Sequence, residues 1–361
     1  MKKIIIAGII FFAAFFCWSC TKQITSYVPQ PTPFAYPSTY TFSNVNYTNQ
    51  RAILATIDTL MATIDQGNTQ NTVVDSVALR NIFNGTTTGV NLSSLCVDSA
   101  AIVIPGYFIG IAADSHSTVA GSDGVPGVGA STQNTSITYL QSSNGFVYRE
   151  LVKTSLMEGL LAYRLENLLH DSIYNTTLIA NLQGNWDASF GYFDVPIGFP
   201  ADTVGAKYWG RYAKNLSASL GLDTVIMNNF LIGRAAIDNG FLLAPNAVPA
   251  NADYYAINDA ATIINAFDVL VIGAAIHDLG QAKLNDSLGD PVLARAYLSS
   301  SWGFVHSLNY NVSPVKSNSV AQINSILAAY GTDLYKFNFA YQHVDSIQAA
   351  IGTGVFANTN F

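Results

Sequence analysis

The stretch 185-NWDASFGYFDVPIG-198 stands out in a chain otherwise built from Ala, Ser, Thr, Asn and Leu. Trp186 and Phe190 are four residues apart, so on a helix they share one face and pack against a neighbouring element. The spacing therefore favours a packed structural corner over an active site. A stacking platform for a sugar or a porphyrin is the alternative interpretation.

Gly191 is expected to end the helix that carries these aromatic residues, because glycine is the usual residue just past a helix C-terminus. Tyr192 and Phe193 would then point into a corner before the turn 194-DVPIGFP-200. The glycine and proline of this turn make a continuation of the helix unfavourable.

Helical periodicity dominates the remainder of the chain. The predicted helices cover residues 49–64, 73–83, 145–172, 208–220, 222–239, 252–283, 291–308, 318–331 and 341–351. The best strand signal is 101-AIVIPGYFIGI-111, and 114–136 is expected to be a long Gly/Ser-rich loop that serves as a lid, a flap or an insertion. The predicted fold class is mainly α, a multi-helix bundle, imelysin-like in one interpretation, with few short strands.

The N-terminus has the features of an export signal. Lys2 and Lys3 precede an apolar run over 4–16, which is too short to span a membrane. Ser19 followed by Cys20 fits a lipoprotein cleavage site, which predicts a signal peptide at 1–19 and an acylated Cys20. Ordinary secretion is the alternative.

A proline-rich segment follows the predicted lipidation site. Prolines in 27-YVPQPTPFAYPSTY-40 favour an extended tether. The predicted organisation is therefore a tether over 20–40 and a mainly helical domain over 41–361, either undivided or as two packed helical halves.

Charge excludes one class of partner. Without Lys2 and Lys3 the chain has 14 basic against 23 acidic residues, a formal charge of −9. Nucleic acid is excluded as a partner because phosphate binding needs a basic surface. With Cys17 removed and Cys20 acylated, Cys96 is the one remaining cysteine, so the fold forms without an internal disulfide.

The three glutamates of the chain all lie on one predicted helix: Glu150, Glu158 and Glu166, with His170 four residues on. Carboxylates and imidazole inside a helical bundle can hold a metal. At 100° per residue only Glu166 and His170 can chelate one ion together. A solvated stripe of an amphipathic helix is the favoured alternative, and Glu158, Glu166 and His170 remain the metal candidates.

No catalytic motif accompanies these residues. None of the five histidines has Glu three residues away, and no GxSxG elbow is present. His170, His277 and His343 each lie near an aspartate, but adjacent helical residues point about 100° apart, so no ready-made dyad is expected.

Several blocks together resemble an uncharacterised bacterial lipoprotein family, catalogued as domain of unknown function 4856. They are 40-YTFSNVNYTNQRAILATIDTL-60, 150-ELVKTSLMEGLLAY-163, 185-NWDASFGYFDVP-196, 208-YWGRY-212, 230-FLIGRAAI-237 and 301-SWGFVHSLNYN-311. The resemblance covers most of the mature chain. The family's usual Tyr-Ser-Gly-Gln is here Tyr47-Thr48-Asn49-Gln50.

The resemblance implies an envelope lipoprotein. Members of the family are thought of alongside imelysin-like proteins and TonB-dependent systems for iron or haem uptake. The matching blocks contain the candidate binding residues Asp187, Arg234, Trp186, Tyr192 and Trp209. Asp187 and Arg234 stand amid apolar neighbours, so a shared buried ion pair and a ligand contact are both open for them.

The expected function is therefore that of a non-catalytic, lipid-anchored protein of the outer membrane, with the periplasmic side favoured. It would bind or hand over iron, haem or another nutrient to a transporter partner. The alternatives are a metal-dependent hydrolase that uses Glu158, Glu166 and His170, and a scaffold that contacts an outer-membrane transporter through 114–136.

Overall fold

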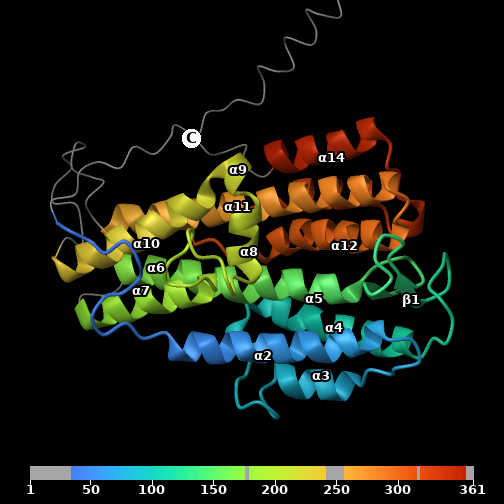
Figure 1. Ribbon diagram of the computed structural model, residues 1–361, viewed down its shortest axis with the longest axis horizontal. Helices are drawn as coiled ribbons and strands as arrows, with labels where there is room; N and C mark the ends of the chain where they lie inside the picture. The colour runs from blue at the N-terminus through green and yellow to red at the C-terminus, as the bar shows by residue number, and fades with distance from the viewer. Residues whose placement is uncertain (1–33, 175–178, 241–255, 315–317, 355–361) are drawn as a thin grey trace, which may run out of the picture. The chain divides into compact units, whose positions relative to one another are not determined.

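Amphipathic and apolar helices build the structure, a computed structural model that describes residues 34–174, 179–240, 256–314 and 318–354 (Figure 1). The helices are α2 (Thr48–Asp65), α3 (Ser76–Phe83), α4 (Asp98–Ser115), α5 (Tyr148–Leu156), α6 (Tyr163–Tyr174), α7 (Ile179–Phe193), α8 (Tyr208–Asn215), α9 (Ser217–Leu220), α10 (Leu222–Asp238), α11 (Ala256–Ser287), α12 (Pro291–Ser307), α13 (Val320–Tyr330) and α14 (Tyr341–Gly354). The mainly helical class is confirmed.

The helices pack in layers around one contiguous core. Helices α2 and α4 pack on one side of α5, with α3 beyond them, and α12 packs on the other side, with α11 and α14 beyond it (Figure 1). Within the described residues the chain from Phe34 onward is one compact unit. The predicted signal peptide and most of the predicted tether lie outside the described residues, and residues 34–40 already belong to the compact unit.

Helix α11 is the longest element and the most central. Its length and mean hydropathy would let it cross a membrane, but more than half of its most apolar stretch is buried inside the protein. It packs against α6, α10, α12 and α14. Its apolar composition is therefore explained by burial on several sides.

The segment predicted as the best strand is a helix. Ile104, Phe108 and Ile111 are buried at the 4 and 3 spacing of α4, and Pro105 lies inside that helix. An apolar run of this kind suits a buried strand and a buried helix equally, and periodicity alone does not separate them. Packing against α3 and α5 decides for the helix.

Two strands form a hairpin inside the region predicted to be a loop. Strand β1 (Gly127–Ala130) pairs antiparallel with β2 (Thr138–Gln141). The turn between them is held by the buried carboxylate of Asp290, which accepts hydrogen bonds from the Ser131 hydroxyl and the Gln133 backbone N–H. This part of the 114–136 region is therefore ordered against the N-terminus of α12.

The helix that carries the 185–198 stretch ends later than predicted. Helix α7 continues through Gly191 to Phe193, and Asp194 adopts a left-handed φ of 58°. A Cβ at Gly191 would lie 2.7 Å from the Tyr47 Cβ and 2.8 Å from the Gln50 Cβ. Gly191 thus serves close packing against α2 rather than helix termination.

A π-helical segment, Met157–Ala162, joins α5 to α6, and two of its backbone carbonyls accept hydrogen bonds from other elements. The Met157 carbonyl accepts a hydrogen bond from the Trp209 indole at 2.7 Å, and the Gly159 carbonyl accepts one from the Val97 backbone N–H at 2.8 Å. Buried carbonyls need such partners. The π-helical segment consequently anchors both the start of α4 and helix α8.

A buried ion pair fastens the N-terminal segment to the helices. Arg234 Nε donates to Asp187 Oδ1 at 2.9 Å, and neither side chain is more than 2% exposed. The Tyr40 hydroxyl donates to the same oxygen at 2.8 Å, and Arg234 Nη2 donates to the Ser43 carbonyl at 3.3 Å. Arg234 also pairs with Asp238 one turn along α10. The ion-pair interpretation of Asp187 and Arg234 is confirmed.

Replacing Arg234 by methionine is expected to lower the free energy of unfolding by about 3–5 kcal/mol, because Asp187 would stay buried without its cation. Lys283→Met is the matched control, since it breaks the partly exposed Lys283–Asp345 pair and should cost under about 1 kcal/mol. Denaturant unfolding of both variants measures the difference. Equal costs would mean that the buried pair contributes little.

Candidate functional site

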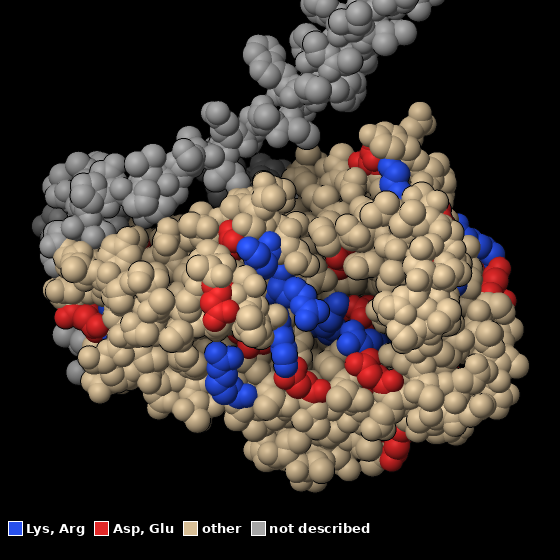
Figure 2. Space-filling model, in the orientation of Figure 1, with Lys and Arg blue, Asp and Glu red and all other residues tan. Residues whose placement is uncertain are grey.

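A cavity of about 890 Å³ opens between α2, α5, α8, α11, α12 and the start of β2. Four of the chain's 16 lysine and arginine residues line it, an unusual concentration in a protein with only 11% charged residues. Figure 2 shows Lys and Arg gathered in a hollow on this face. The charged side chains that line it are Arg149, Lys153, Lys207, Arg211, Asp58, Asp65, Glu150 and Asp278.

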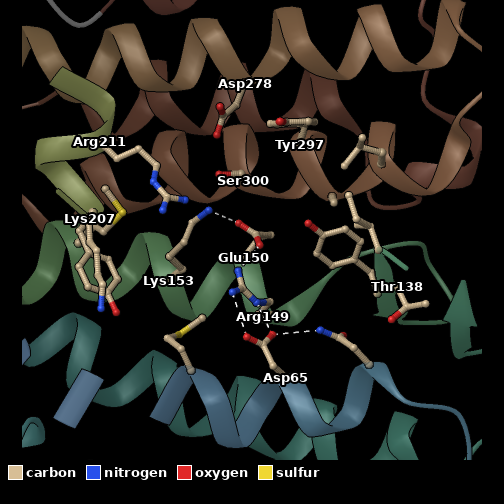
Figure 3. Close-up of a pocket in the computed structure, with 18 of the residues that line it drawn as sticks. Asp65, Thr138, Arg149, Glu150, Lys153, Lys207, Arg211, Asp278, Tyr297 and Ser300 are labelled. Carbon is tan, nitrogen blue, oxygen red and sulfur yellow. Dashed lines mark hydrogen bonds and ion pairs between the residues drawn. The ribbon is translucent and has the colours of Figure 1, made fainter. Parts of the chain in front are cut away.

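Ion pairs organise the part of the cavity between α2 and α5 (Figure 3). Arg149 donates through Nε and Nη2 to both carboxylate oxygens of Asp65, and through Nη1 to Glu150 at 2.7 Å. Lys153 donates to the other oxygen of Glu150. Asn68 donates to Asp65 at 3.0 Å. Each of these groups is thereby held in one position.

The protonation state of Glu150 follows from this arrangement. Burial opposes ionisation, but the adjacent Lys153 and Arg149 outweigh it and lower the pKa of Glu150 to about 2. Glu150 is therefore a carboxylate at every physiological pH. A base of such low pKa accepts protons poorly, so Glu150 is a poor general base. Its hydrogen bond from Lys153 instead holds that cation in position.

Helix α8 supplies most of the second wall. Lys207 and the Tyr208 hydroxyl both donate to Asp58 on α2, at 2.6 and 2.8 Å. Tyr208 has a φ of 40°, a rare and strained conformation for a bulky residue. Strain of this kind costs of order 1–3 kcal/mol and concentrates at functional sites.

Two neighbours in 208-YWGRY-212 explain how α8 reaches this position. Trp209 is fully buried and is held by its hydrogen bond to the Met157 carbonyl. A Cβ at Gly210 would lie 2.5 Å from Val195 Cγ1, so only glycine allows this approach. The sequence thereby turns Tyr208, Arg211 and Tyr212 toward the cavity.

Asp278 on α11 organises the third wall. Its Oδ2 accepts from the Tyr212 hydroxyl at 2.7 Å, and its Oδ1 lies 2.9 Å from His277 Nδ1. The Ser300 hydroxyl lies 3.4 Å from that of Tyr212. The expectation that adjacent His and Asp residues form no pair is wrong here, because the side-chain torsions of His277 and Asp278 bring the two groups together despite their divergent Cβ directions.

Arg211 differs from the other three cations of the cavity. Within the described residues, its guanidinium has no carboxylate within ion-pair distance, whereas Arg149, Lys153 and Lys207 each have one. Figure 3 shows the Arg211 and Lys153 side chains pointing into the same part of the cavity. Since the four lining carboxylates already have partners, Arg211 is available to an anion from outside.

The binding residues predicted from the sequence lie elsewhere. Asp187, Arg234, Trp186, Tyr192 and Trp209 are all buried, and none lines the cavity. The indole N–H of Trp186 donates to the Phe230 carbonyl at 3.0 Å, and that of Trp209 to Met157. Both indole N–H groups thus bond to backbone carbonyls, and neither ring is exposed. These tryptophans therefore position helices and offer no platform on which a ligand could stack.

The metal candidates are not brought together. Among the described residues no group of three or more His, Cys, Asp or Glu side chains is placed to hold a metal ion. Glu158 and Glu166 are buried, and His170 lies 3.9 Å from Asp171. The π-helical segment between Glu150 and Glu166 changes the angular relation that a regular helix would give. The prediction of a solvated stripe is also wrong, since all three glutamates are buried.

The cavity residues that sequence reasoning missed share one signal. In 208-YWGRY-212 and 149-RELVK-153, cations and aromatic or acidic residues cluster within one helical turn or two, in a chain that has few charges. The two blocks line the same cavity because of how distant helices pack together. The local sequence pattern does not predict this packing.

Comparison with models of known families, with curated proteins and with solved structures finds no match for this chain. The family resemblance of the sequence therefore stays a prediction.

The raised pKa of Glu158 predicts that the stability of the protein depends on pH. Burial, together with the charge of Asp268, raises the pKa of Glu158 from 4.5 to about 8. Between these values the folded protein holds a proton that the unfolded chain releases, so its contribution to stability falls as pH rises. Relative to the unmodified protein, Glu158→Gln should gain up to about 4 kcal/mol from pH 5 to pH 8, at about 1.4 kcal/mol per pKa unit.

Denaturant unfolding at a series of pH values measures this gain. Asp98→Asn is the control, since Asp98 is exposed at the start of α4 and its replacement should give no trend over the same range. Parallel curves for the Glu158→Gln variant and the unmodified protein would contradict a raised pKa of Glu158.

Proposed function

We propose that this protein is a lipid-anchored binding protein of the cell envelope that holds a small anionic nutrient in the charged cavity without converting it. The observation that carries the proposal is Arg211, a cation directed into the cavity with no carboxylate partner among the described residues. The volume of about 890 Å³ lies within the range of about 300–1,000 Å³ typical of small-molecule sites.

The ion pairs around Arg211 support binding of an anion. Glu150 fixes Lys153 beside the open part of the cavity, and Asp58 fixes Lys207 at its edge. Preorganised cations bind an anion without a large loss of side-chain freedom. Arginine is especially suited, because its planar fork binds carboxylate and phosphate through two parallel hydrogen bonds.

A binding role fits this site better than catalysis. Glu150, which is buried, has a pKa of about 2 and is paired with two cations. His277 is paired with Asp278, but within the described chain no serine or threonine hydroxyl donates to it. General base catalysis works best with a pKa near the ambient pH and a nucleophile within hydrogen-bond reach.

A hydrophilic nutrient fits the cavity better than haem. Charged side chains from α2, α5, α8 and α11 surround the space, so a porphyrin ring would have to cover them with apolar surface. The described residues also hold no metal-binding cluster that would favour iron itself. Transfer of the bound molecule to an outer-membrane transporter, of the TonB-dependent kind in the simplest case, is the step that anchoring would serve.

Binding is tested by isothermal titration of the purified protein with phosphate, citrate and glucuronate. Arg211→Gln should weaken binding of the anion that binds best by about 10-fold or more, because charge-assisted hydrogen bonds are lost. Lys214→Gln is the control, since Lys214 is exposed on the same helix and does not line the cavity. Equal effects of the two variants would show that only net charge matters.

Anchoring is tested separately at Cys20. Mass spectrometry of the N-terminal peptide should show an acylated cysteine, and the Cys20→Ser variant should move from the detergent phase to the aqueous phase on phase separation, because two or more acyl chains are needed for stable membrane attachment. An unmodified Cys20 in the mature protein would contradict the lipoprotein prediction and leave the anion site untouched.

A further inference from the structure

Two tyrosines that line the cavity have hydroxyl groups that take no part in the hydrogen bonding of the described residues. Tyr139 on β2 and Tyr297 on α12 both line the cavity, and among the described residues no side chain or backbone group hydrogen-bonds to either hydroxyl. Figure 3 shows Tyr297 pointing into the space near Asp278 and Ser300. By contrast, the hydroxyls of Tyr208 and Tyr212 are engaged by aspartates.

Both free hydroxyls are neutral donors at physiological pH. Burial, with the charge of Glu150 adding to it, raises the pKa of Tyr139 to about 12, and burial with Asp278 and Glu150 raises the pKa of Tyr297. Glu150 therefore lies near both tyrosines, and it also accepts a hydrogen bond from Lys153. A ligand therefore meets cations and free hydroxyls together.

This combination selects among anions. Inorganic phosphate or a simple carboxylic acid would satisfy Arg211 and Lys153, but would leave the two tyrosine hydroxyls without partners and most of the cavity without contacts. A molecule that carries several hydroxyls as well as a negative charge engages both groups. Tyrosine rings also present flat apolar faces beside their polar tips, which suits a ring with C–H faces and hydroxyl edges.

We propose that the ligand is a sugar ring bearing one anionic group, a carboxylate or a phosphate. Arg211 and Lys153 bind the anionic group, and Tyr139 and Tyr297 bind ring hydroxyls. This assignment rests on the proposed function, since it names the class of anion that the cavity holds. Arginine binds carboxylate and phosphate alike, so the two kinds of sugar are distinguished by experiment.

The test compares matched ligands by isothermal titration of the purified protein. Glucuronate, galacturonate and glucose 6-phosphate represent charged sugars, glucose and galactose lack the charge, and acetate and phosphate lack the sugar. At least one charged sugar should bind about 10-fold or more tightly than its sugar and its anion alone, since each missing hydrogen-bonded group costs roughly a factor of ten. The preferred member identifies the anionic group.

Variants separate the two parts of the site. Tyr297→Phe should weaken binding of the preferred charged sugar by about 5–10-fold and leave phosphate binding unchanged, whereas Arg211→Gln should weaken both. Tyr341→Phe, which removes a hydroxyl from a tyrosine that is 69% exposed and outside the cavity, is the control.

The outcomes separate the two proposals. Binding of phosphate or acetate with no gain for any charged sugar, or equal losses of phosphate and sugar binding in Tyr297→Phe, would overturn the sugar assignment and leave the anion site standing. Absence of binding by every anion, with and without a sugar, would overturn both.

Discussion

The hydrogen bond from the Trp209 indole to the Met157 carbonyl is the interaction on which the site depends. It joins α8 to a buried carbonyl of the π-helical segment that lies between α5 and α6. The same bond fixes α8, which contributes Tyr208, Arg211 and Tyr212 to the cavity. The π-helical segment therefore helps to hold α8, the helix that forms one wall of the cavity.

Charge is used in two distinct ways in a chain that has little of it. The Asp187–Arg234 pair is fully buried, and it fastens the N-terminal segment to α7 and α10 through Tyr40 and Ser43. The charges of the cavity range from the buried Glu150 to the half-exposed Lys207, and every lining carboxylate has a partner while Arg211 has no carboxylate partner among the described residues. The buried pair holds parts of the fold together, whereas the charges of the cavity leave Arg211 available to a ligand.

The local sequence pattern was sufficient to predict most helices and insufficient where a segment is apolar on every face. The helices from 208 onward were predictable within a few residues because their apolar positions recur with the helical period. The 101–111 segment is apolar on all sides, so its periodicity does not distinguish strand from helix, and contacts with α3 and α5 decide its form. Gly191 looked like a helix end, yet its function is the close approach of α2.

For the site, the sequence alone determined the residue types and their local clustering: a chain poor in charge, a 208-YWGRY-212 block on one helix, and a glutamate and two cations within 149–153. It also singled out Asp187 and Arg234 but left a buried ion pair and a ligand contact open for them, and the structure shows the ion pair. Only the tertiary structure decided that Arg149 and Glu150 would meet Lys207, Arg211 and Asp278 across one cavity, while Trp186 and Trp209 would be enclosed. The reason is that these residues are separated by tens of positions along the chain, and their proximity is set by how whole helices pack, which no local spacing encodes.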